Sequence, residues 1–151
     1  MRYRNSAGAK RRPVAFFALW HIMNTNTLLS GLNVLVVEDM FMLAQDLAEQ
    51  LIGAGCTVVG PAPTVQQALD EIDGIALHGA VLDVNLRGER SFPLAEHLTR
   101  DGVPFIFLTG YDSATVFPDS FRDTPKLTKP VDYNLLIEAV ARFRKDSAAP
   151  G

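Results

Sequence analysis

The sequence of 151 residues contains a single cysteine, Cys56, so neither an intrachain disulfide nor a cysteine-based metal site can form within it. Such sparse use of cysteine fits a protein of a reducing cytoplasm. The apolar run near the start, residues 13–23, is too short to span a bilayer. Acidic residues are absent before Glu38, whereas five of the fourteen lysines and arginines lie in the first twelve positions.

This uneven distribution leaves an acidic body, because all seventeen acids and only nine of the basic residues follow position 12. Direct nucleic-acid binding relies on clustered lysine and arginine, so the body is a poor candidate for it. Residues 1–30, basic and then apolar, are predicted to be an N-terminal extension. This segment is compatible with a disordered or packed arm, and also with a natural start at Met23. The lack of a cleavage site argues against a secretory signal, and membrane attachment is not expected.

The length suits one domain with a proper core. Short apolar, β-branched runs alternate with segments whose apolar residues recur at helical spacing. Strands are predicted at 32–37, 56–59, 80–85, 103–108 and 126–129, helices at 40–52, 64–72, 92–99, 113–117 and 132–144, and loops at 60–63 and 86–91. This alternation, without a repeat or linker, predicts an α/β domain over residues 31–146, in which five helices flank a parallel five-stranded sheet, and a short tail, residues 147–151.

The carboxyl ends of four predicted strands carry polar residues that a buried strand would not otherwise need. They are Glu38 and Asp39, Asp83, Thr109, and Lys129. The carboxyl ends of parallel strands share one edge, so these residues are expected to converge. Three neighbouring carboxylates raise one another's pKa unless a cation lies among them, and an all-oxygen set suits Mg²⁺.

The remaining groups at this edge suit an anion. Lys129 can pair with Asp83 or neutralise a tetrahedral anion, and Thr109 and the backbone N–H of Gly110 can donate to its oxygens. The pattern indicates an aspartate that accepts a phosphoryl group with the help of a metal.

Four motifs in this order resemble the receiver domain of two-component response regulators, over about residues 32–145. They are Val-Val-Glu-Asp at 36–39, Leu-Asp-Val-Asn-Leu at 82–86, Leu-Thr-Gly-Tyr at 108–111 and Thr-Lys-Pro at 128–130. The resemblance implies a flavodoxin-like, doubly wound fold with strand order 2-1-3-4-5.

The resemblance also implies a role for each residue. Asp83 would be phosphorylated by a phosphohistidine of a sensor histidine kinase or histidine phosphotransfer protein. Asp39 would bind Mg²⁺ directly, Glu38 through water, and Asn85 through its backbone carbonyl. The phosphoryl oxygens would be held by Thr109 and Lys129, and the bond between Lys129 and Pro130 would be cis.

One position departs from this family. Receivers usually place a tyrosine or phenylalanine three positions before the lysine, where its rotation reports phosphorylation, and here that position is Lys126. The stretch 104–111 resembles an atypical, largely alphaproteobacterial subgroup of receivers that lacks this aromatic residue. Tyr111, two residues past Thr109, is therefore predicted to take part in the switch.

The sequence predicts a stand-alone cytoplasmic receiver, because only six residues follow Lys145. It would act as a relay component or phosphate sink through protein partners, with catalysis only on itself. Two alternatives stay open: a pseudo-receiver that only binds proteins, and an aspartate-nucleophile phosphohydrolase. The phosphohydrolase would need an acid two positions after Asp83, where this chain has Asn85.

Overall fold

The computed structural model describes residues 28–110 and 117–144. The main sheet consists of β1 (Asn33–Val37), β2 (Thr57–Ala62), β3 (Gly79–Asp83), β6 (Phe105–Thr109) and β7 (Lys126–Thr128). The helices are α2 (Phe41–Gly53), α3 (Val65–Ile72), α4 (Phe92–Arg100) and α5 (Tyr133–Ala141). A separate hairpin is formed by β4 (Asn85–Leu86) and β5 (Glu89–Arg90), and η1 (Asp119–Phe121) is a 3-10 turn.

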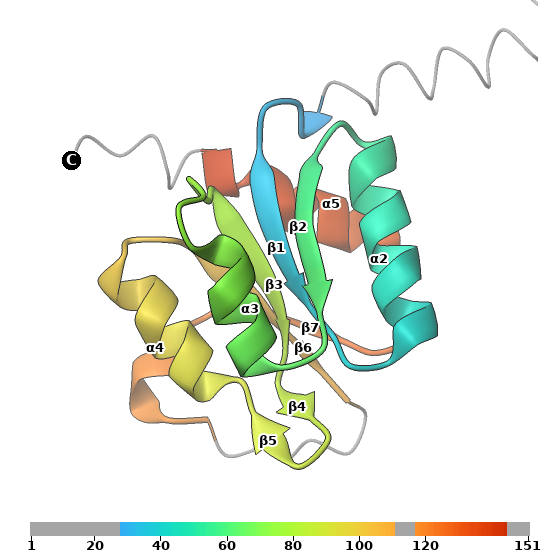
Figure 1. The fold of residues 1–151 in the computed structure, drawn as a ribbon. Coiled ribbons are helices and arrows are strands. Elements are labelled where there is room, and N and C mark those ends of the chain that lie inside the picture. Colours follow the sequence, from blue (N-terminus) through green and yellow to red (C-terminus); the bar gives the residue numbers. More distant parts are fainter. Residues whose placement is uncertain (1–27, 111–116, 145–151) are drawn as a thin grey trace, which may run out of the picture.

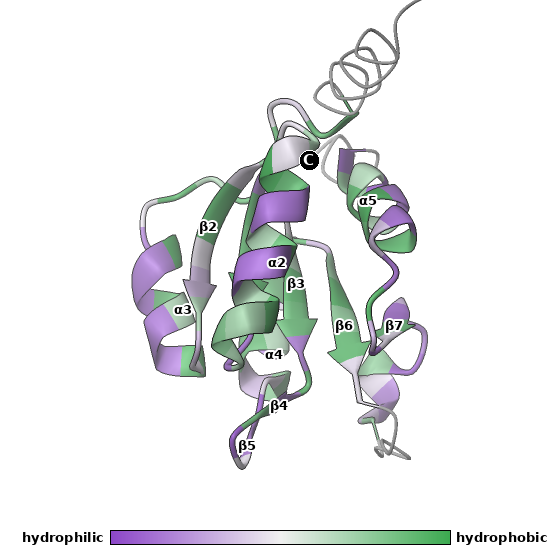
Figure 2. Cartoon of the chain, turned by 90° about the vertical axis from the view of Figure 1, so that its right-hand side faces the viewer, coloured by the Kyte–Doolittle hydropathy of each residue, from purple (hydrophilic) through white to green (hydrophobic). Residues whose placement is uncertain are grey.

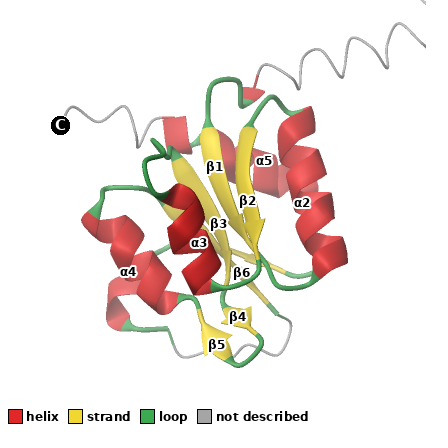
Figure 3. Ribbon diagram, viewed as in Figure 1, coloured by secondary structure: helices red, strands yellow, loops and turns green. Residues whose placement is uncertain are grey.

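The five strands of the main sheet are parallel and lie in the order β2-β1-β3-β6-β7. This order is the one predicted, and the doubly wound, flavodoxin-like α/β fold is confirmed. Helices α3 and α4 cover one face of the sheet, and α2 and α5 cover the other (Figure 1). The β4–β5 hairpin stands at the edge toward which the strand arrows point (Figure 3).

Successive residues of β1 contribute to cores on opposite faces of the sheet, as the alternation of side chains along a strand requires. Val34 and Val36 belong to the cluster that includes residues of α2 and α5. Leu35 and Val37 belong to the cluster that includes residues of α3 and α4. Because all four are fully buried, β1 carries no polar side chain between its first residue, Asn33, and the acidic edge. The neighbouring strands β3 and β6 are mainly hydrophobic as well (Figure 2).

Two helices begin at the residues that were predicted to cap them. Thr64 Oγ1 accepts a hydrogen bond of 3.1 Å from the backbone N–H of Gln67 at the start of α3. Asp132 Oδ1 accepts from the N–H groups of Asn134 and Leu135 at the start of α5. Each cap satisfies donors that have no partner inside the helix.

Strand β2 continues through Gly60 and Pro61, which were wrongly predicted to lie in a loop. The pairing with β1 is irregular here, because Val37 lies opposite Ala62 across a bulge. β2 is an edge strand. A proline is tolerated at an edge or a bulge, because the N–H group that proline lacks is not needed there for a hydrogen bond to a neighbouring strand. Gly60 has φ +94°, and a Cβ atom there would lie 2.7 Å from the nitrogen of Ala62. The extension ends at the acidic edge, where the carbonyl of Ala62 accepts from the N–H of Glu38.

The number of helices differs from the five that were predicted. The described ranges contain four α-helices, and the short η1 turn lies just after the expected fourth helix, 113–117. Most of that expected helix, 113–116, lies outside the described residues. Pro118 directly precedes η1, and proline cannot continue the interior of a helix that comes before it. Within 28–110 and 117–144, no helix is both long and apolar enough to cross a membrane.

Candidate functional site

The three predicted acids meet at the carboxyl edge of the sheet. Glu38 and Asp39 directly follow β1, Asp83 is the last residue of β3, and one carboxylate oxygen from each lies within 4.8 Å of the others. Glu38 and Asp83 are buried, with 2% and 4% of their surface exposed. The side chain of Asp39 is 12% exposed, so the cluster opens to solvent on that side.

Lys129 bridges the two buried acids. Its Nζ lies 2.9 Å from Asp83 Oδ2 and 3.0 Å from Glu38 Oε2. The peptide bond between Lys129 and Pro130 is cis. The backbone N–H of Lys129 donates to the carbonyl of Thr109 at 2.8 Å, which ties this lysine to the end of β6. A single ammonium group thus faces two buried carboxylates.

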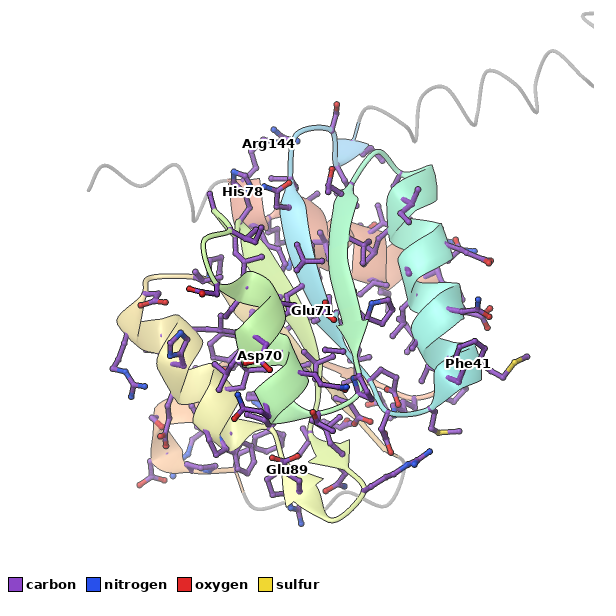
Figure 4. All side chains as sticks on the ribbon, viewed as in Figure 1. Phe41, Asp70, Glu71, His78, Glu89 and Arg144 are labelled. Atoms are coloured by element: carbon purple, nitrogen blue, oxygen red, sulfur yellow. The ribbon has the colours of Figure 1, made fainter. Side chains whose placement is uncertain are left out.

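Thr109 and the loop after β3 complete the edge. Thr109 is the last residue of β6 and is 8% exposed. The backbone N–H of Asn85 donates to Asp83 Oδ1 at 3.2 Å, so both oxygens of Asp83 have partners. Gly110 follows Thr109 at the same edge. Figure 4 places Phe41, at the start of α2, and Glu89, on the hairpin, at this end of the molecule, far from His78 and Arg144.

Burial shapes the electrostatics of the cluster. Desolvation, with a smaller contribution from the charge of Asp83, raises the pKa of Glu38 to about 7, although the N–H of Met40 and the ammonium of Lys129 act against it. Burial alone would lower the pKa of Lys129, but its hydrogen bond to Asp83 and its contact with the carboxylate of Glu38 outweigh burial and raise that pKa. The buried part of the site is therefore short of positive charge.

The donor set fits a divalent cation. Glu38, Asp39 and Asp83 offer only oxygen ligands, which Mg²⁺ prefers. Glu38 Oε2 is buried and accepts no hydrogen bond of regular geometry, although the ammonium of Lys129 is close to it. An under-satisfied buried carboxylate oxygen beside two further carboxylates is a position where a cation, or water bound to one, would be favourable.

Arg87 also belongs to this site, and the sequence analysis did not identify it. Its Nε lies 3.3 Å from Asp39 Oδ2. Residues 86–91 were predicted to be a loop, whereas β4 and β5 pair there with only Arg87 and Gly88 between them. Positive φ angles at both residues, 51° and 85°, form the tight turn. The usual signal for such a turn is Asn-Gly, and Arg-Gly lacks the asparagine that would have indicated it.

Similar solved structures share this architecture. The response regulator receiver domain protein (CheY-like) from Methanospirillum hungatei JF-1 has a TM-score of 0.68 and 24% identity, over 79% of this chain and 98% of that one. SdrG from Sphingomonas melonis Fr1, solved in solution, is 37% identical with a TM-score of 0.66, over 78% of this chain and 98% of SdrG. The chain belongs to the response regulator receiver family.

A curated relative agrees with this family. The receiver is 26% identical over 117 residues to the sensory transduction protein LytT of Bacillus subtilis (strain 168), and the match covers 76% of this chain. It covers only 48% of LytT, so the chain spans about half the length of that relative. No profile of a known protein family matches the chain.

Lys126 has a clear structural role in this receiver. Its Nζ donates to the carbonyls of Phe121, Arg122 and Thr124 at 2.8–3.0 Å. It also lies 4.5 Å from the centre of the Phe117 ring. Lys126 therefore holds the segment around η1 to the start of β7. Tyr111, the other predicted switch residue, lies outside the described residues.

A pH dependence of stability follows from the buried Glu38. Its pKa of about 7 in the folded receiver exceeds the ordinary value of 4.5, so the folded state binds the proton more tightly than the unfolded state. The stabilisation is complete below the ordinary pKa and is lost as the pH rises through 7. Relative to Glu38→Gln, we expect the wild type in EDTA to lose about 2–3 kcal/mol of unfolding free energy between pH 5 and pH 8.

Urea unfolding of both proteins across this range measures the difference. The control is Glu49→Gln, which removes an exposed acid of α2 and should leave the pH dependence of the wild type unchanged. Parallel curves for wild type and Glu38→Gln would show that Glu38 does not titrate in this range.

Proposed function

We propose that Asp83 accepts a phosphoryl group from a phosphohistidine of a sensor histidine kinase or histidine phosphotransfer protein. The observation that carries this proposal is the contact of one Asp83 oxygen with Lys129, beside two further acids at an edge that also holds Thr109. The phosphorylated chain would then act by binding a protein target, or would serve as a phosphate sink, in the cytoplasm.

The chemistry follows from the positions of these groups. An oxygen of the Asp83 carboxylate attacks phosphorus, the phosphorus–nitrogen bond of the donor breaks, and the imidazole leaves with the bonding electrons. Lys129, 2.9 Å from Asp83 Oδ2, neutralises charge on the phosphoryl oxygens, and Thr109 Oγ1 and the N–H of Gly110 donate to them. Mg²⁺, held by Asp39 and Asp83, by Glu38 through water and by the Asn85 carbonyl, would supply further neutralisation of these oxygens.

The residues around Asp83 disfavour hydrolysis of external phosphate esters. A phosphohydrolase of the aspartate-nucleophile class needs a second acid two positions after the nucleophile, and Asn85 has no carboxylate to take a proton. A pseudo-receiver that only binds proteins has no need of a lysine between two buried carboxylates, because burying charges is costly.

Incubation of the full chain with acetyl phosphate and Mg²⁺ tests this proposal. Intact mass spectrometry should find one phosphoryl group per chain, stable in acid and released in base, as expected of an acyl phosphate. The absence of any adduct would favour the pseudo-receiver. Repeated turnover of an external phosphate ester, such as p-nitrophenyl phosphate, would favour the phosphohydrolase.

A further inference from the structure

The side chain of Arg87 reaches the acidic cluster from the β4–β5 hairpin. Its Nε is 3.3 Å from Asp39 Oδ2, while 82% of the arginine side chain remains exposed. Lys129, which follows β7 at the same edge of the sheet, contacts the two buried acids, Glu38 and Asp83. Arg87 is therefore the cation paired with the acid that faces solvent.

The local backbone does not explain an arginine at this position. Arg87 and Gly88 form a two-residue turn and both have positive φ angles, which is the geometry of a type I′ turn. Asparagine or glycine is favoured at the first position, because other side chains are strained there. An arginine at a strained turn position near a functional site therefore indicates a role for its side chain rather than for the turn.

We propose that Arg87 is an internal counter-ion that competes with Mg²⁺ for Asp39 and thereby lowers the metal affinity of the receiver. The inference rests on the proposed function, because it assumes that Mg²⁺ binds at these acids. An ion pair with a largely exposed arginine is weak and is readily displaced by a divalent cation. Arg87 would thus keep the carboxylate of Asp39 neutralised when Mg²⁺ is scarce and release it when Mg²⁺ binds.

The same hairpin offers a matched control. Arg90 lies opposite Asn85 in the hairpin, is exposed, and forms no ion pair with any residue in the described ranges. Replacing either arginine with alanine removes one positive charge from the hairpin. The difference between the two variants therefore isolates the contact with Asp39 from the general effect of net charge.

Calorimetric titration of the full chain with Mg²⁺ gives the affinity directly. We expect Arg87→Ala to bind Mg²⁺ about two- to fivefold more tightly than Arg90→Ala, as expected for removal of one exposed ion pair. Arg87→Lys keeps the charge and should stay close to the wild type. Arg87→Asn, which suits the turn, should bind as tightly as Arg87→Ala, so that a disturbed hairpin cannot account for the result.

Nuclear magnetic resonance adds a readout at the side chain itself. On addition of Mg²⁺ to the wild type, the Nε–H signal of Arg87 should move toward the position of a free arginine, and that of Arg90 should not. Equal affinities of Arg87→Ala and Arg90→Ala, in a wild type that binds Mg²⁺, would overturn the inference alone. Failure of both the wild type and Arg87→Ala to bind Mg²⁺ would overturn the metal site of the proposed function as well.

Discussion

Asp83→Asn is expected to abolish incorporation of the phosphoryl group from acetyl phosphate. The carboxamide oxygen can still accept from the N–H of Asn85, so the turn after β3 keeps its hydrogen bond. The amide is a far weaker nucleophile than the carboxylate, and its nitrogen has no lone pair to offer to phosphorus. Intact mass spectrometry of the treated variant should show the unmodified chain only.

The matched control is Asp73→Asn, which makes the same chemical change at an exposed acid that caps the end of α3. It should incorporate the phosphoryl group as the wild type does. Thermal unfolding establishes that both variants are folded before they are compared. A phosphoryl group still present on Asp83→Asn at the level of the wild type would place the acceptor elsewhere, with Asp39 the next carboxylate of the cluster.

The convergence of the site could be predicted from the sequence because it depends on topology alone. Once the runs ending at Val37, Asp83 and Thr109 are recognised as parallel strands, their carboxyl ends must share one edge. The helix starts at Thr64 and Asp132 were equally predictable, since capping depends on residues only two or three positions away.

The parts that were missed depend on contacts that no local pattern encodes. Gly60 and Pro61 look like a loop, and only their position on an edge strand opposite a bulge lets them continue β2. The contact of Arg87 with Asp39 joins residues 48 positions apart across a turn with an unusual sequence. Lys126 lies where receivers usually have an aromatic residue, which the sequence shows. Its hydrogen bonds to three carbonyls depend on the η1 turn, which the sequence did not predict.

The charges of the site give its three acids different roles. Glu38 and Asp83 share the partly buried ammonium of Lys129, so neither carboxylate is fully compensated. The charge of Asp39 is neutralised by Arg87, whose side chain is largely exposed, so breaking this ion pair costs little free energy. Entry of a cation is therefore expected on the Asp39 side, while Lys129 stays beside Asp83, the proposed acceptor of the phosphoryl group.

Lys129→Met is expected to lower the unfolding free energy of the receiver in EDTA by about 3–5 kcal/mol at pH 8, because it removes the ammonium group that faces two buried carboxylates. The carboxylates of Glu38 and Asp83 would remain buried without their ammonium group. Methionine fills much of the volume of the lysine stem, so the loss reports charge more than packing. Urea unfolding at pH 8 and at pH 5 measures it.

Lys126→Met is the matched control, three positions earlier at the start of β7. Its ammonium serves backbone carbonyls rather than carboxylates, so its loss should cost about 1–2 kcal/mol at both pH values. The cost of Lys129→Met should instead shrink at pH 5, because without the ammonium the buried carboxylates take up protons and lose their charge. A cost that is the same at both pH values would mean that Lys129 stabilises the fold through packing, and that the two acids do not depend on its charge.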